Sequence, residues 1–473
     1  MFFFYSIRMR GISVAAKVRQ NSIREEIIME SALTPLEKTE KLLYRFDHPK
    51  AGTWERVDLD IRRNRMGWGT VFLKDASGIP RKNCEIRVRQ KSHDFQFGCN
   101  AFKLGNFADP GKNAAYEEFF KRVFNEAVVP FLWDSTEPEQ GKFRFAADSP
   151  AMDRRPPADL LIDWCEQNRI APKGHWMFCD NFVPRWLPRD SRDVMILVEK
   201  RIAELAERYA SRVRKWDVVN ESFTYHPRKN PAIGDAAVPE DYVRQIFKMA
   251  EKYFPVTSEF IYNDGTEISF RAFAHESSPM FLLADRLLRR GVKLDGLGLQ
   301  FHLYGALEDA MRMRVKSFFD PAHILQVLDQ LGHLRLPLHI SEISIPTYPE
   351  LPREPAEELQ ARLLRNFYRL WFSQENCSSI VYWNLCDKTA LGDESRYDAG
   401  LISVDFKEKP SYRMLDQLIN HEWHTECTIV TDENGEASWN GFYGEYELEF
   451  AGSAHSVGLT SRSENEYSFL LAE

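Results

Sequence analysis

Two glutamates each end a short apolar run of the chain. Glu221 closes "WDVVNE" (216–221), directly after Asn220, and Glu342 closes "HISE" (339–342). A pair of carboxyl groups held at one site can cleave a glycosidic bond. One donates a proton to the departing oxygen, and the other acts on the opposite face of the sugar as nucleophile or base. Whether the two glutamates meet depends on the elements that carry them.

Eight short apolar runs alternate with helical patterns along the chain. Residues 198–209, for example, place Val198, Ile202, Leu205 and Tyr209 on one helix face. Eight strand and helix pairs over roughly 330 residues predict an α/β fold, a (β/α)8 TIM barrel. A doubly wound open sheet is the alternative, although no glycine-rich fingerprint follows the early strands. The eight runs are 94–100, 127–133, 171–178, 216–221, 259–264, 294–302, 336–342 and 378–384.

A barrel of this kind would bring the two glutamates together. Functional side chains of TIM barrels lie at the C-terminal ends of the strands. Asn220 and Glu221 end the fourth run, and Glu342 ends the seventh. Strands four and seven face each other across the barrel mouth, so the fold predicts one site that contains both carboxyl groups.

The segments that precede and follow the predicted barrel in the chain alternate apolar and polar residues. Residues 69–90 do so around a "DASG" turn and residues 425–450 around "DENG", and each segment is typical of a β-hairpin. Two isolated hairpins are too small to be stable alone, so we expect both chain ends to pair into one accessory β-sandwich. The predicted division is an N-terminal extension (1–45), a β-rich segment (46–92), the catalytic barrel (93–420) and a C-terminal β segment (421–473) that pairs with 46–92.

The composition limits the kinds of molecule that the chain is expected to bind. The 473 residues are 44% hydrophobic, enough to fill a large core, and carry a formal charge of −8. That charge disfavours nucleic acid and anionic membranes as partners. No apolar stretch approaches a membrane span, and the N-terminus makes a poor signal peptide, so we expect a cytoplasmic location. Seven scattered cysteines suggest neither a disulfide framework nor a thiolate metal site. The oligomeric state leaves no signal in the sequence.

The motifs resemble glycoside hydrolase family 10, whose best-known members are endo-β-1,4-xylanases. Besides "WDVVNE" and "HISE", the chain has "LWDSTEPEQGKFRF" (132–145), "KGHWMF" (173–178), "IYNDG" (261–265), "GLGLQFHL" (296–303) and "VYWN" (381–384). These seven matches fall in family order. The resemblance implies a retaining hydrolase without cofactor or metal, acting on an oligo- or polysaccharide.

The resemblance also implies roles for individual residues. Glu221 would be the general acid/base and Glu342 the nucleophile. Asn220 would bind the 2-hydroxyl of the sugar at the cleaved bond, and His302 would hold Glu342 ionised. The other expected sugar-binding residues are His175, Gln300, Trp383 and Asn263.

The chain departs from the family pattern around the sugar site. Val128, Val129 and Leu132 stand where the family carries polar contacts to the upstream sugars, and Cys179 and Asp180 replace a Trp-His pair. Ser344 replaces an aspartate after the nucleophile, and a second late tryptophan is missing within "TALGDE". We therefore expect a short, decorated or non-xylan saccharide as substrate, because cleavage of a polymer draws on several consecutive subsites.

Other interpretations of the same residues remain open. His175 and His302 could ligate a metal in a barrel hydrolase, although the first strand ends without the expected His-x-His pair. The chain could also be a non-catalytic carbohydrate-binding protein on a hydrolase scaffold, or a structural protein. We expect the flanking sandwich to brace the barrel, because Trp439, Phe442 and Tyr443 are spaced as a core would need.

Overall fold

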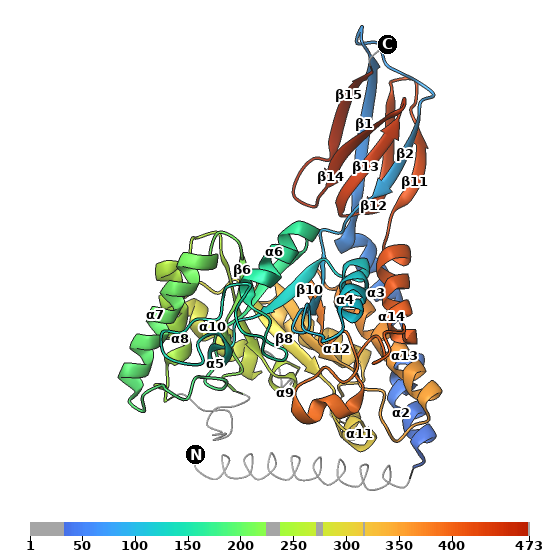
Figure 1. Ribbon diagram of the computed structural model, residues 1–473. Coiled ribbons are helices and arrows are strands. Elements are labelled where there is room, and N and C mark those ends of the chain that lie inside the picture. The colour runs from blue at the N-terminus through green and yellow to red at the C-terminus, as the bar shows by residue number, and fades with distance from the viewer. Residues whose placement is uncertain (1–32, 224–236, 271–277, 316, 472–473) are drawn as a thin grey trace, which may run out of the picture.

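The computed structural model describes residues 33–223, 237–270, 278–315 and 317–471. Its centre is a closed barrel of parallel strands in the order β10-β3-β4-β5-β6-β7-β8-β9 (Figure 1). All eight predicted runs form strands, and closure of the sheet excludes the doubly wound alternative. The strands are β3 (Gln96–Asn100), β4 (Glu126–Pro130), β5 (Ala171–Phe178), β6 (Lys215–Asn220), β7 (Glu259–Asp264), β8 (Gly296–His302), β9 (Leu338–Ser344) and β10 (Cys377–Tyr382).

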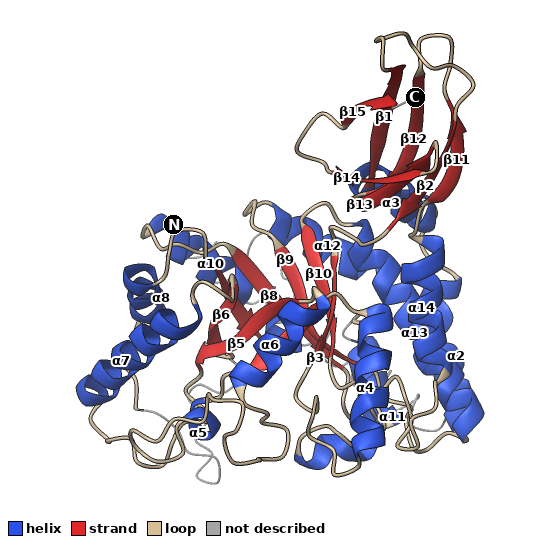
Figure 2. Ribbon diagram, turned by 45° about the horizontal axis from the view of Figure 1, so that its top comes forward, coloured by secondary structure: helices blue, strands red, loops and turns tan. Residues whose placement is uncertain are grey.

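Helices surround the barrel and bury one face each against it (Figure 2). Helix α7 shows the reason: Asp190 caps its N-terminus, and the predicted face of Val198, Ile202, Leu205 and Tyr209 is buried. The longer barrel helices are α4 (Pro110–Val123), α6 (Ala158–Asn168), α7 (Ser191–Tyr209), α8 (Tyr242–Tyr253), α10 (Pro279–Arg289), α11 (Leu307–Val315), α12 (Pro321–Gly332), α13 (Arg353–Ser373) and α14 (Pro410–Gln417). Short turns of helix are α5 (Trp133–Thr136), α9 (Thr266–Ser269), η1 (Gly392–Tyr397) and η2 (Leu418–Glu422). None of the described helices is both long enough and apolar enough to span a bilayer.

Both ends of the chain form a β-sandwich, as predicted. One sheet has the order β12-β1-β15 and the other β11-β2-β13-β14. Figure 1 shows the early strands β1 and β2 lying among the late strands. The strands are β1 (Met66–Asp75), β2 (Glu85–Gln90), β11 (Glu426–Val430), β12 (Glu436–Phe442), β13 (Gly444–Phe450), β14 (Ser453–Leu459) and β15 (Glu466–Leu471).

The two predicted hairpins are wrong in their pairing. Strand β1 pairs with β12 and β15, whereas β2 pairs with β11 and β13, so each turn carries the chain from one sheet across to the other. Alternation of apolar and polar residues indicates which face of a strand is buried, but it does not specify the strand that supplies the hydrogen bonds.

The first part of the predicted β-rich segment 46–92 is helical instead. Helix α2 spans Pro35–Asp47, and helix α3 spans Thr53–Arg65. Val57 and Ile61 lie one helical turn apart on α3 and are buried in the barrel's core cluster, while Phe46 of α2 packs edge-on against Phe367 of α13. The expected β structure is therefore wrong for residues 53–65. Most of the predicted N-terminal extension, residues 1–32, lies outside the described residues.

The sandwich docks on the end of the barrel where the strands begin. Phe442 is buried in the barrel's core cluster, with its ring centroid 6.3 Å from that of Phe372 and 6.2 Å from that of His93. Trp423, just after η2, stacks on Phe372 at 4.1 Å. One aromatic cluster thus joins the two parts of the chain.

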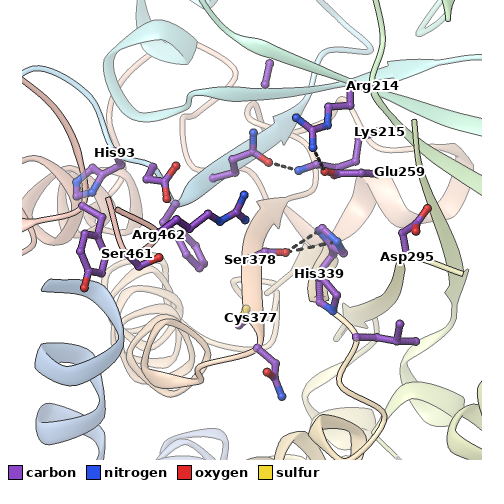
Figure 3. A pocket seen from close by; sticks show the side chains of 18 of the residues that line it. His93, Arg214, Lys215, Glu259, Asp295, His339, Cys377, Ser378, Ser461 and Arg462 are labelled. Carbon is purple, nitrogen blue, oxygen red and sulfur yellow. Dashed lines mark hydrogen bonds and ion pairs between the residues drawn. The ribbon is translucent and has the colours of Figure 1, made fainter. Parts of the chain in front are cut away.

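A cavity of 1270 Å³ opens at the same end of the barrel (Figure 3). Several cations on its wall are paired, including Arg214 with Glu259 at 2.9 Å and Lys293 with Asp295. None of the predicted site residues lines this cavity. It lies away from the mouth where the glutamates are expected.

Replacing Phe442 with alanine should destabilise the whole chain. Loss of a buried ring costs about 3 kcal/mol or more, and this ring belongs to the barrel core as well as to β12. We expect the guanidinium midpoint, followed by tryptophan fluorescence, to fall clearly below that of wild type. Val430→Ala on exposed β11 is the control and should change little. An unchanged midpoint for Phe442→Ala would show that the sandwich does not brace the barrel.

Candidate active site

The two predicted glutamates lie at the mouth where the barrel strands end. Asn220 is the last residue of β6, and Glu342 lies on β9. Glu221 follows with a φ of +57°, a left-handed conformation that side chains other than glycine seldom adopt. This turn breaks the alternation of the strand, so Asn220 and Glu221 can both face the mouth. The backbone N–H of Glu221 donates to the Asn263 carbonyl at 2.8 Å and fixes the turn.

A single amide group joins the two carboxylates. Nε2 of Gln300 on β8 donates to Oε1 of Glu221 at 2.8 Å and to Oε1 of Glu342 at 3.0 Å. Because they share one nitrogen, these oxygens lie no more than about 6 Å apart, in the spacing range of two-carboxylate hydrolases. The structure therefore brings both glutamates and Gln300 together.

Asn263 is a second amide that hydrogen-bonds several site residues, and it lies beneath Gln300. Its Nδ2 donates to Oδ1 of Asn220 at 2.7 Å and to Oε1 of Glu342 at 2.8 Å, and its Oδ1 accepts from Ser341 at 2.5 Å. A Cβ on Gly298 of β8 would meet Oδ1 of Asn263 at 2.2 Å, so the glycine makes room for this side chain. Asn263 has no exposed surface. It can orient its neighbours, but in this arrangement it presents no atom to a ligand.

His302 holds the other oxygen of Glu342. Its Nε2 lies 3.1 Å from Oε2 of Glu342, and its Nδ1 lies 3.0 Å from Oγ of Ser344. If Nε2 carries the proton, Nδ1 accepts from the serine hydroxyl, so a neutral partner stands where the family carries an aspartate. The ring of Tyr304 stacks on His302 at 5.3 Å, and its hydroxyl accepts from Nδ2 of Asn384 at 2.9 Å.

His175 approaches the same carboxylate from β5. Its Nδ1 lies 2.8 Å from Oδ2 of Asp217, and its Nε2 lies 3.9 Å from Oε1 of Glu342. Asp217 is fully buried and also pairs with Lys173 at 2.9 Å. In the described part of the chain, no group of three or more histidine, cysteine, aspartate or glutamate side chains is placed to hold a metal ion.

The surroundings drive the pKa values of the two glutamates apart. Burial, together with the charge of Glu342, raises the pKa of Glu221 well above its ordinary value, and the Gln300 hydrogen bond only partly opposes this. Burial also tends to raise the pKa of Glu342, but the nearby His175 and the hydrogen-bonded His302 outweigh it, so that pKa is lowered. At neutral pH the pair therefore holds one proton on Glu221 and one charge on Glu342.

Trp383 closes the site on the side of β10 and β3. It is 7% exposed and meets the rings of Phe102 and His175 edge-on, at 5.2 and 5.3 Å. Val128 belongs to the same cluster, and Leu132 packs with Trp176 and Cys179 in a neighbouring one. Of the positions that depart from the family pattern, Val128, Leu132 and Cys179 are thus filled by buried apolar groups, whereas Asp180 and Ser344 are buried and polar.

Several residues of this network were not predicted from the sequence. Asp217 and Lys173 are charged residues within buried strands, and that contrast with their neighbours was the available signal. Ser341, Tyr304 and Asn384 stand beside predicted residues, yet their types carry no comparable signal.

Comparisons with known proteins identify the family of the chain. The model of glycosyl hydrolase family 10 matches residues 91–417. Anti-sigma-I factor RsgI6 of Acetivibrio thermocellus is 25% identical over 399 residues, which cover 83% of this chain and 45% of that protein. Endo-1,4-beta-xylanase 2 of Arabidopsis thaliana is 24% identical over 417 residues, covering 86% of this chain and 34% of the plant protein. The chain thus spans less than half of either relative.

Shorter relatives match over nearly their full length. Endo-1,4-beta-xylanase B of Thermotoga neapolitana is 22% identical over 370 residues, covering 74% of this chain and 96% of that enzyme. The crystal structure of xylanase 10B from Thermotoga petrophila, in complex with xylobiose, has a TM-score of 0.56 at 20% identity and covers 70% of this chain and 95% of that one. The chain belongs to glycosyl hydrolase family 10 and is similar to endo-1,4-β-xylanases.

Proposed function

We propose that the chain cleaves β-glycosidic bonds by double displacement, with Glu342 as nucleophile and Glu221 as general acid/base. The observation that carries this proposal is the bridge of Gln300 between the two carboxylates. A separation below about 6 Å is nearer the roughly 5 to 5.5 Å of retaining enzymes than the roughly 6.5 to 9.5 Å of inverting ones.

The first step uses the opposite charge states of the pair. The carboxylate of Glu342 attacks the anomeric carbon, and the bond from that carbon to the departing oxygen breaks. Glu221 gives its proton to the departing oxygen, which leaves as an alcohol. The hydrogen bonds from Asn263, Gln300 and His302 hold the nucleophile ionised and aimed until the attack.

The second step reverses the role of Glu221. Once Glu342 is an ester its negative charge is gone, so the pKa of Glu221 falls and the group becomes a base. It takes a proton from water as the water oxygen attacks the anomeric carbon. The ester bond breaks and returns Glu342 as a carboxylate, and two inversions retain the configuration of the sugar.

The remaining predicted residues would bind the sugar. Nδ2 of Asn220 donates to none of the described groups, and it is available for a 2-hydroxyl beside the cleaved bond. His175, Gln300 and Trp383 surround the same place. We assign Asn263 to positioning, because both polar atoms of its side chain are already used by Asn220, Ser341 and Glu342.

We infer a short, decorated or non-xylan saccharide as substrate. Val128, Val129 and Leu132 are buried and offer no polar atom to an upstream sugar. Ser344 gives His302 a neutral partner. The two glutamates proposed to cleave the bond are thus present, whereas fewer side chains offer polar contacts to further sugars of a xylan chain.

Replacing Glu342 with alanine should reduce turnover of an aryl β-glycoside by more than about a thousandfold, because the nucleophile is lost. Added azide should restore part of the turnover and release a glycosyl azide of inverted configuration, identified by NMR. Glu433→Ala, on an exposed turn of the sandwich, is the control. Unimpaired turnover in Glu342→Ala would contradict the assignment of Glu342 as the nucleophile.

Replacing Glu221 with glutamine should remove the alkaline limb of the pH profile. In wild type, kcat/KM should fall at high pH as Glu221 loses its proton and at low pH as Glu342 gains one. The variant should keep its acid limb and accumulate the glycosyl-enzyme on substrates with good leaving groups, seen as a burst in stopped flow. An alkaline limb that persists in Glu221→Gln would assign that limb to another group.

A substrate panel tests the narrowed specificity. We expect higher kcat/KM on aryl β-glycosides, short oligosaccharides or decorated saccharides than on linear xylan, because upstream polar contacts are missing. The products are identified by chromatography. Rapid cleavage of linear xylan into ordinary endo-products would overturn this part of the proposal.

A further inference from the structure

The sheet β12-β1-β15 has an outer face that carries an exposed tryptophan. Trp68 on the central strand β1 is 67% exposed. Thr70 and Phe72 continue the same row, because alternate residues of a strand share a face. The inner residues of β1, Val71 and Leu73, are fully buried in the sandwich core.

The outward direction of Trp68 is enforced by its neighbours. Gly67 and Gly69 lie on the inner side, where a Cβ on Gly69 would meet the indole of Trp439 at 2.4 Å. A slip of one residue would turn Trp68 inward, onto the space that Trp439 already fills. The exposed ring is therefore a fixed part of this sheet.

Polar groups flank the row on both neighbouring strands. Asn440 of β12 stands opposite Trp68, and Ser438 stands opposite Thr70, with 2.9 Å between the two hydroxyl oxygens. On the other side Ser468 of β15 stands beside Phe72. Two carboxylates border the same row, Glu436 opposite Phe72 and Glu466 beside Thr70. We call Trp68, Thr70, Phe72, Ser438, Asn440 and Ser468 the outer-sheet patch.

We propose that the outer-sheet patch is a binding site for a glycan chain, separate from the catalytic mouth. A sugar ring has an apolar face that stacks on an aromatic ring and a rim of hydroxyls that pairs with hydroxyl and amide groups. Trp68 and Phe72 stand four residues apart on one strand, about 13 Å, which suits a short run of linked sugars. The carboxylates of Glu436 and Glu466 beside the patch can accept hydrogen bonds from sugar hydroxyls.

The outer-sheet patch lies far from the catalytic mouth, so the glycosidic bond that is cleaved does not lie on it. The sandwich docks where the barrel strands begin, whereas Glu221 and Glu342 lie where they end. A glycan on the patch would instead tether the enzyme to the polymer that carries its substrate. The site is thus independent of the catalytic roles proposed above.

Affinity electrophoresis separates tethering from cleavage. The probes are soluble arabinoxylan, glucuronoxylan and mixed-linkage β-glucan, cast into native gels, and every protein carries Glu342→Ala so that the probe stays intact. We expect at least one probe to retard the parent protein. Trp68→Ala should weaken that binding about tenfold or more, whereas Trp68→Phe, which keeps a ring, should retain most of it. Leu470→Ala, an exposed change at the margin of the same sheet, is the control and should bind as the parent does.

Two outcomes would overturn the inference. One is equal retardation of the parent and Trp68→Ala on every probe, including no retardation of either. The other is a matching loss in turnover of a small aryl β-glycoside when Trp68→Ala is made with Glu342 intact, since that would mean a damaged fold. Absence of aryl glycoside turnover in wild type, with retardation still dependent on Trp68, would overturn the proposed catalysis and support the glycan patch.

Discussion

Two buried carboxyl groups that share one hydrogen-bond donor cannot both be charged without a large free-energy cost, and the catalytic mouth is built around this constraint. Gln300 contacts both groups, so it cannot by itself decide which one keeps the proton. The asymmetry comes from His175 and His302, which lower the pKa of Glu342. Asn263, His302 and His175 gather around Glu342, whereas among the described side chains Gln300 is the hydrogen-bond partner of Glu221.

The barrel makes this asymmetry possible because its parallel strands deliver side chains to one rim from distant parts of the chain. Glu221, Asn263, Gln300 and Glu342 follow one another around the rim on or just after β6, β7, β8 and β9. Glycine at position 298 lets the Asn263 side chain lie across β8, and the left-handed turn at Glu221 brings the acid to the mouth. The supporting groups Asp217, Lys173 and Ser344 lie on the strands as well, so rigid elements rather than loops hold the reacting atoms.

The sandwich gives the chain a second unit whose two faces differ. Its inner side packs Trp439 against Gly69 of β1, and Phe442 links it to the aromatic cluster around Phe372. Its outer sheet leaves Trp68 in water, where a ring beside hydroxyl and amide groups suits a glycan. The same alternation along β1 and β12 thus supports bracing on one side and recognition on the other.

The sequence by itself determined the barrel and which apolar runs form its strands, and it singled out Glu221 and Glu342, although β9 continues past Glu342 to Ser344. Buried parallel strands read as continuous apolar runs, and a carboxylate or amide at the end of such a run stands out. It also predicted that the chain ends would share a sandwich, but not which strands pair, because alternation describes the buried face of a strand and leaves its hydrogen-bond partners open. Helix α3 was missed, since its apolar residues Val57 and Ile61 are few and become buried only against the barrel. The family resemblance already implied that Glu221 keeps the proton, but only the tertiary structure supplied the physical reason and placed Asn263 beneath the mouth. Both depend on neighbours that are dozens of residues away in the chain and meet only when the barrel closes.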